Sequence, residues 1–203
     1  MKTKLAIFAA IIIFGFIPSG FNQTVNSKKN QSNNNFDYNG FCKVYQKFTN
    51  SILKADTTEF NKFINKELGL FIIEQPGSMP WFFKTKTIGS YLSPENWSFF
   101  NRQFQSINLQ PKLGDLPVVD CDYANDSSAY NKNGCFVQKK NKFRTEKIWE
   151  YSEMDEVTKR GIELSASKIS LTVINTYNYG FYFGLIKNKW YLLFVDLRTP
   201  CSA

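Results

Sequence analysis

This chain of 203 residues contains no histidine, which limits the catalytic chemistry that its side chains can perform. Without imidazole there is no Ser-His or Cys-His catalytic pair, no H-E-x-x-H zinc site and no histidine pH switch. Carboxylates, four cysteines, a serine–lysine pattern and many aromatic side chains remain. None of them forms a complete reaction signature, so the sequence predicts no catalytic residues, no metal site and no cofactor.

The serine–lysine pattern is the first candidate for catalysis. Ser165-Ala166-Ser167-Lys168 matches the S-x-x-K motif of penicillin-recognising serine enzymes, in which the lysine lies one helical turn from the serine and takes its proton. Alternating apolar residues follow directly, so we expect a strand on which the two side chains diverge. The partner motifs S-D-N and K-T-G are absent. The pattern therefore predicts no catalytic serine.

Pairs of carboxylates are the second candidate. Glu67 with Glu74, or Glu146 with Glu150, are pairs that a glycoside hydrolase would need on either side of a cleft, with the carboxyl groups about 5 to 10 Å apart. Sequence spacing does not reveal a cleft. A small hydrolase that uses a carboxylate pair therefore stays open as an alternative function.

Aromatic side chains are the strongest positive feature, because loop aromatics often contact ligands. Trp81 and Phe82 lie in a stretch flanked by proline and glycine, and with Tyr91 and Trp97 they suit a stacking platform for a sugar or the mouth of an apolar pocket. Burial under a loop is the competing interpretation. A ligand bound inside the fold would also meet three aromatic residues of the C-terminal half, which suit a plain core equally well: Tyr177, Tyr179 and Phe181.

The four cysteines suggest an oxidising compartment. An even number of cysteines in an exported chain predicts disulfides, and four cysteines allow three connectivities. We favour Cys121–Cys135, because that bond closes a short polar loop, and then Cys42–Cys201, which would join the first helix to the C-terminus. No C-x-x-C spacing occurs, so the cysteines do not match a zinc site.

The N-terminus predicts export. Residues 1–23 have the form of a secretory signal, with Lys2 and Lys4 before the apolar run Leu5–Ile17, which is too short to span a bilayer comfortably. Cleavage removes these two lysines and no acid, so the formal charge falls from +8 to +6. This modest excess of positive charge is too small to indicate a nucleic-acid-binding surface. We expect a periplasmic or extracellular protein with no stable membrane anchor and no nucleic-acid partner.

In the first half of the chain, polar segments and apolar residues at helical spacing predict a lead-in followed by helices. Residues 24–36 are mostly Asn, Gln, Ser and Lys and predict a flexible lead-in to a single domain over residues 37–203. An apolar stripe from Phe41 to Ile52 predicts a first helix, and Asp56 as N-cap begins a second stripe that runs to Leu68. Residues 70–73 predict a short buried strand, and Ser93-Pro94 predicts the start of a third helix.

The second half changes to the two-residue period of strands. Alternating apolar residues from Ile169 to Leu185 predict a pleated surface, Asn188 marks a tight turn, and Trp190 to Val195 predicts the returning strand. Residues 136–151 predict a further strand or hairpin. Helices that precede antiparallel strands define an α+β fold with N-terminal helices packed on a C-terminal antiparallel sheet.

This layout resembles the NTF2-like, cystatin-related group of α+β folds, and more narrowly small exported bacterial domains of unassigned function. The residues that carry the resemblance are the helix pair ending in Glu67-Leu68-Gly69-Leu70 and the closing hairpin with Lys189-Trp190-Tyr191-Leu192. The resemblance implies a bent antiparallel sheet whose concave side is covered by the helices. Catalytic members of the group use an Asp or His inside this cone, and no such motif is matched here.

The resemblance and the aromatic residues together predict a non-catalytic domain that binds a small ligand or a protein partner, with a homodimer also open. In such a binding domain, Trp81 would lie at the rim of the cone. A third alternative is a structural or protein-interaction module, for which the cone would be filled by Phe side chains.

Overall fold

A capped amphipathic helix opens the described part of the chain. The computed structural model describes residues 36–123 and 129–201, and α1 spans Tyr38–Leu53. The Asp37 side chain accepts the Gly40 N–H at its start, and a stripe of apolar residues is buried as predicted: Phe41, Tyr45, Phe48 and Ile52. The predicted signal sequence (1–23) and nearly all of the lead-in (24–36) lie outside the described residues.

The second helix is shorter than its sequence pattern. Helix α2 (Thr57–Asn61) begins at the predicted cap, with Asp56 accepting the Glu59 N–H at 2.9 Å. The expected continuation to Leu68 is wrong, because the Asn65 side chain accepts the N–H groups of Glu67 and Leu68 at 2.9 and 3.0 Å. These bonds close a turn in place of further helix and lead the chain into the sheet.

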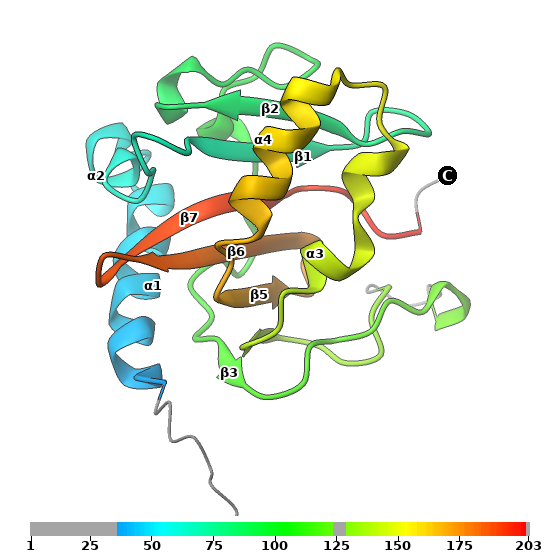
Figure 1. Cartoon of the computed structure of the whole chain (residues 1–203). Coiled ribbons are helices and arrows are strands. Elements are labelled where there is room, and N and C mark those ends of the chain that lie inside the picture. Colours follow the sequence, from blue (N-terminus) through cyan, green and yellow to red (C-terminus); the bar gives the residue numbers. More distant parts are fainter. Residues whose placement is uncertain (1–35, 124–128, 202–203) are drawn as a thin grey trace, which may run out of the picture. The chain divides into compact units, whose positions relative to one another are not determined.

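Seven strands of the described residues form one mixed sheet in the order β2-β1-β7-β6-β5-β4-β3 (Figure 1). The sheet confirms the α+β class, but the prediction of a purely antiparallel, C-terminal sheet is wrong. β1 pairs parallel with β7, and β3 with β4, because segments that precede the C-terminal strands in the chain enter the same sheet. The strands are β1 (Leu70–Glu74), β2 (Trp81–Thr85), β3 (Lys112–Leu113), β4 (Cys135–Gln138), β5 (Leu171–Asn175), β6 (Tyr179–Ile186) and β7 (Lys189–Asp196).

Each face of the sheet carries its own apolar core. α1 packs on one face, where Phe48 contacts Phe181 and Phe183 with ring centroids 5.0 and 5.5 Å apart. The other face is covered by α3 (Lys142–Glu146) and α4 (Glu156–Ala166), which lie in front of the sheet in Figure 1. Helices therefore cover both faces, whereas the NTF2-like resemblance implied helices on the concave side of a bent sheet.

Three segments differ from their predicted structure. The helix expected from Ser93 is a tight turn followed by a 3₁₀ turn at Phe99–Asn101, because Asn96 adopts the left-handed conformation (φ 63°) and ends the helical path. The strand expected over 136–151 stops at Gln138, since Asn141 caps α3 by accepting the Arg144 N–H at 3.0 Å. Helix α4 was not predicted.

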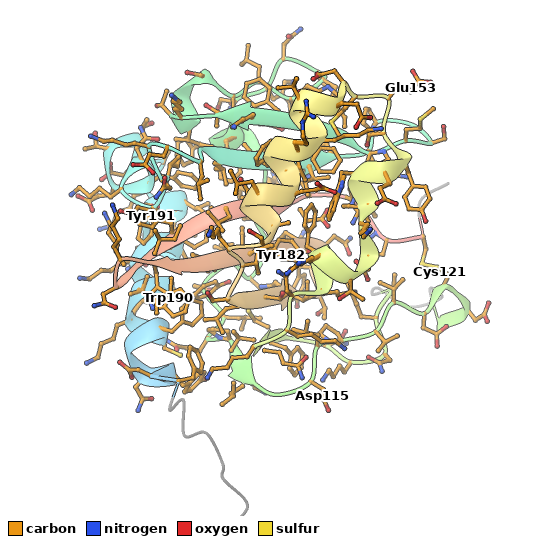
Figure 2. All side chains as sticks on the ribbon, in the orientation of Figure 1. Asp115, Cys121, Glu153, Tyr182, Trp190 and Tyr191 are labelled. Atoms are coloured by element: carbon orange, nitrogen blue, oxygen red, sulfur yellow. A yellow bond between two sulfur atoms is a disulfide. The ribbon has the colours of Figure 1, made fainter. Side chains whose placement is uncertain are left out.

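The disulfide pairing differs from both predicted bonds. Cys121 is bonded to Cys201, with Cα atoms 5.5 Å apart, and Cys42 and Cys135 are free thiols. The predictions Cys121–Cys135 and Cys42–Cys201 are therefore wrong. Cys135 begins β4 inside the core, whereas Cys121 lies in an exposed turn that the C-terminal residues after β7 reach. Figure 2 shows Cys121 on the opposite side of the view from Trp190 and Tyr191.

Candidate functional site

One pocket combines an exposed indole ring with a buried carboxylate that is paired with an arginine, and we call it the Trp97 pocket. It encloses about 450 Å³ at the end of β1. Buried Glu74, Tyr91 and Phe99 form its inner part, together with half-buried Arg102. Exposed or half-buried side chains, most of them polar, form the rim: Ser93, Glu95, Trp97, Ser98, Asn101 and Gln103.

Glu74 is the central polar residue of this pocket. It is the last residue of β1, only 6% of its surface is exposed, and its carboxylate accepts hydrogen bonds from the Tyr91 hydroxyl and from Arg102 Nη2, the latter at 2.8 Å. Burial raises the pKa of the Tyr91 hydroxyl, and the hydrogen bond to Glu74 adds to this rise. The buried carboxylate therefore has both a neutral and a charged donor, as a buried charge requires.

A closed turn holds Trp97 at the rim. The Asn96 N–H donates to the Ser93 carbonyl at 2.8 Å, the Ser93 N–H donates to the Trp97 carbonyl at 2.9 Å, and the Ser93 hydroxyl accepts the Trp97 N–H at 3.2 Å. The chain is therefore fixed on both sides of Trp97, yet 64% of its surface is exposed. A large ring that is exposed on an ordered turn is available for contact with a ligand.

A row of aromatic rings supports the pocket from the core. Tyr91 lies edge-on to Phe83 and Phe99, with centroids 5.4 and 6.1 Å away. Trp81 continues the row at 5.8 Å from Phe83. Trp81 also pairs directly with Glu74 across β1 and β2, and residues paired in this way point to the same face of a sheet. The row places Trp81 next to the pocket, although its ring does not line it.

The structure separates the other predicted ligand-binding residues from Trp81 and Trp97. Phe82 points to the opposite face of the sheet, where its ring is 6.4 Å from Phe143. Tyr177 is exposed at the turn between β5 and β6. Tyr179 and Phe181 are buried in the core under α1, and the Tyr179 hydroxyl donates to the Gln105 carbonyl. These two rings are part of the core between α1 and the sheet, where a ligand-binding cone was expected.

Sequence reasoning missed Arg102 and the role of Glu74. Glu74 was considered only as a partner of Glu67, which lies in the turn before β1 while Glu74 ends that strand. Its actual partner, Arg102, is 28 residues further along the chain. A glutamate at the end of a wholly apolar strand was the available signal, since a carboxylate there must find a cationic partner when buried.

The other predicted carboxylate pair does not face a common cleft either. Glu146 lies 3.4 Å from Lys142 and Glu150 lies 3.2 Å from Lys147, each within its own helical turn. Both pairs are therefore ordinary ion pairs on the surface.

The S-x-x-K tetrapeptide leads into β5 as expected, but it lies at the end of α4 and is not itself part of a strand. Ser165 is buried in the last turn of the helix, and its hydroxyl has no hydrogen-bond partner within residues 36–123 and 129–201. Lys168 is exposed beyond the helix. The buried hydroxyl is closed to substrate, so this arrangement gives no nucleophile and base.

A second pocket, of about 420 Å³, lies at the end of β7. Arg198 donates to both carboxylate oxygens of Asp196, at 2.9 and 2.8 Å, and Lys142 is 3.4 Å from Glu146. Burial raises the pKa of Tyr130 to about 12, with the Asp196 charge adding to the rise. Its aromatic lining is buried or half-buried, so this pocket lacks the exposed ring that distinguishes the Trp97 pocket.

Comparison with known proteins gives no further guide to the site. No protein-family model, no curated protein and no solved structure matches the chain. Among the helices of residues 36–123 and 129–201, none has both the length and the apolar character needed to cross a membrane.

Proposed function

We propose that the chain is an exported, non-catalytic binding domain that holds a neutral, sugar-like ligand in the Trp97 pocket. One observation carries the proposal: the exposed Trp97 ring lies on the same pocket as the buried Glu74 carboxylate and its partner, half-buried Arg102. An aromatic ring offers a flat apolar surface with little entropy to lose, and a few fixed polar groups set the orientation of a bound ligand. A pyranose presents both surfaces, with C–H groups on its faces and hydroxyls at its edge.

The charges around the pocket favour a neutral ligand. Two carboxylates, Glu74 and Glu95, line it beside a single guanidinium, Arg102. Arg102 already donates to Glu74, so little positive charge is left for an acidic sugar. Asn101 and Gln103 add amide groups that both donate and accept hydrogen bonds. Local charge at the pocket thus opposes the +8 charge of the whole chain.

Export and family are part of the same proposal. The charged and apolar pattern of residues 1–23 supports a cleaved signal, and its test is the N-terminal sequence of the mature protein. The NTF2-like resemblance remains a proposal, supported by α1 packed across the strands of the closing hairpin. A ligand in the Trp97 pocket would bind beside the sheet and not inside a cone.

The test is titration calorimetry of the purified protein with β-1,4-linked oligosaccharides of glucose and of N-acetylglucosamine. We expect saturable binding of at least one of them and weaker binding of oligogalacturonate, the acidic probe. Trp97→Ala should weaken binding about tenfold, because one stacking contact is worth about 1.5 kcal/mol. Tyr151→Ala is the matched control, since that ring is 72% exposed and does not line the pocket.

The outcomes separate the proposal from its competitors. Binding that survives Trp97→Ala would move the site elsewhere. Preferential binding of oligogalacturonate would indicate attraction by the net positive charge alone. Failure of both neutral oligosaccharides to bind would reject the sugar-like ligand and favour a structural or protein-interaction module.

A hydrolase is the second candidate, because two carboxylates, Glu74 and Glu95, line one pocket. The same neutral oligosaccharides, incubated with the protein, distinguish the two functions. A binding domain leaves them intact. Release of new reducing ends that is lost in both Glu74→Gln and Glu95→Gln would instead establish the hydrolase.

A further inference from the structure

Two free thiols, Cys42 and Cys135, come together where α1 crosses the edge of the sheet. Cys42 lies on α1 and is half-buried, whereas Cys135 is the first residue of β4 and is 2% exposed. On α1, Tyr38, Cys42 and Tyr45 follow one another at intervals of four and three residues. Side chains at these intervals lie on the same face of a helix.

The residues on either side of Cys42 fix where this helical face lies. The Tyr38 hydroxyl donates to the Pro111 carbonyl at 2.6 Å, immediately before β3. The Tyr45 hydroxyl lies 3.6 Å from the Cys135 sulfur at the start of β4. β3 and β4 are paired neighbours, so both tyrosines contact the same edge of the sheet. Cys42, one turn from each, therefore faces this edge beside Cys135.

The electrostatics of the thiols agree with this placement. Burial raises the pKa of the Cys135 thiol to about 12, and Cys42 contributes to the rise. The same two cysteines raise the pKa of the Tyr38 hydroxyl, after the larger effect of its burial. The two sulfurs and the two tyrosine hydroxyls thus form one cluster between α1 and β4.

We propose that Cys42 and Cys135 are a redox pair that closes as a second disulfide in an oxidising environment and links α1 to β4. Because Cys121 is bonded to Cys201, this is the one remaining pairing of the four cysteines. The bond would cross-link the N-terminal helix to the sheet edge from inside the core. It is independent of any ligand in the Trp97 pocket, which lies elsewhere on the sheet.

The bond forms by thiol–disulfide exchange with a small disulfide such as oxidised glutathione. The half-buried Cys42 thiolate attacks one glutathione sulfur, the other glutathione leaves as a thiol, and a mixed disulfide remains on Cys42. The Cys135 thiol then loses its proton and attacks the Cys42 sulfur, which releases the second glutathione. Two electrons pass from the cysteine pair to glutathione, and the two cysteine protons end on the two glutathione thiols.

The test is peptide mapping of the full chain after equilibration with oxidised glutathione, denaturation and alkylation with iodoacetamide. We expect no alkylated cysteine, and a peptide pair in which Cys42 is joined to Cys135. Alkylation of both Cys42 and Cys135 in the denatured chain would overturn the proposal. A cross-link from either of them to Cys121 or Cys201 would also overturn it.

A shifted cysteine is the matched control. Cys42→Ser combined with Lys43→Cys moves the thiol by one residue to an exposed position of α1. This variant should leave Cys135 as a thiol that reacts only after denaturation. If the shifted cysteine formed a bond to Cys135 in the same yield, the orientation of Cys42 toward Cys135 would not be what determines the pairing.

Discussion

Among single residues, the Trp97 pocket depends most on the hydroxyl and guanidinium groups that surround Glu74. A carboxylate in this position is stable only while its oxygens remain hydrogen-bonded. Tyr91 supplies one of these bonds and also packs against Phe83 and Phe99, so the same residue joins the polar cluster to the aromatic core. The pocket is therefore formed before any ligand arrives, which lowers the cost of ordering it.

Replacement of Tyr91 tests this arrangement through its pH dependence. At neutral pH, Tyr91→Phe should lower the free energy of unfolding by about 1.5 to 3 kcal/mol, the value of a hydrogen bond to a charged group. Burial raises the pKa of Tyr91 in the folded chain. Its stabilisation is thus complete below about pH 10, where the unfolded tyrosine is also neutral, and falls as pH rises further. The variant lacks this loss, so the difference between the two proteins should shrink above about pH 10.

Urea unfolding at neutral pH and above about pH 10 measures this difference. Tyr151→Phe is the control, because that exposed ring should leave the unfolding curve unchanged at both pH values. A constant difference between the wild-type protein and Tyr91→Phe at the two pH values would contradict a buried, neutral Tyr91.

The sequence shows which residue types are available for the site, but it does not show which of them are in contact in the folded chain. Trp97 was grouped with the aromatic residues around Trp81 and Phe82, whereas Ser93, predicted to begin a helix, caps a tight turn instead. Glu74 and Arg102 come from a strand end and from the segment after a 3₁₀ turn. Nothing in their spacing indicates a contact, because tertiary packing alone brings them together.

Among the secondary-structure elements, α4 is held in place because the segment that follows it packs closely against β6. Gly184 lies on β6 where the segment from α4 to β5 crosses it, and the Ser170 N–H donates to the Phe183 carbonyl at 2.8 Å. A Cβ atom on Gly184 would lie 2.7 Å from the Lys168 carbonyl oxygen and 2.7 Å from a Leu193 methyl carbon. Glycine is therefore required here by space.

Gly184→Ala should accordingly lower the free energy of unfolding by about 1 to 3 kcal/mol, the usual cost of overpacking. Thermal unfolding followed by circular dichroism measures this loss. Gly77→Ala is the matched control, since a Cβ atom there meets nothing within 4 Å. Equal stability of the two alanine variants would show that α4 and its linker are not held against β6 as described.

The elements that sequence periodicity predicted are those with a long apolar stripe. α1 and the β6–β7 hairpin were predicted because their buried residues recur at regular spacing. α4 was missed because it has only three buried residues, Ile162, Ser165 and Ala166, of which the last two are small and give no apolar stripe. The parallel pairing of β1 with β7 could not be predicted, since a strand buried on both faces has no alternation to reveal its partners.

In the chain as a whole, the Cys121–Cys201 disulfide is a long-range constraint. It joins residues 80 positions apart and ties the C-terminal segment after β7 to an exposed turn. The sequence favoured a shorter loop because Cys135 is nearer to Cys121. Cys135 is buried at the start of β4, however, and is therefore not the partner of the exposed Cys121.

Loss of this bond should destabilise the whole fold. The double variant Cys121→Ser, Cys201→Ser should lower the free energy of unfolding by about 4 to 5 kcal/mol, because the bond removes loop-closure entropy from the unfolded chain. Denaturant unfolding measures the loss. Wild-type protein in a thiol reductant serves as the control and should lose at least as much stability, since both of these cysteines are exposed. Unchanged stability of the double variant would contradict the assigned pairing.

The most direct test of the proposed function is nuclear magnetic resonance of the indole N–H signals of the four tryptophans during titration with the neutral oligosaccharides. Binding in the Trp97 pocket should shift the Trp97 signal progressively to saturation, with a smaller shift of Trp81, while the signal of buried Trp149 stays in place. An unchanged Trp97 signal at saturating oligosaccharide would contradict binding in this pocket.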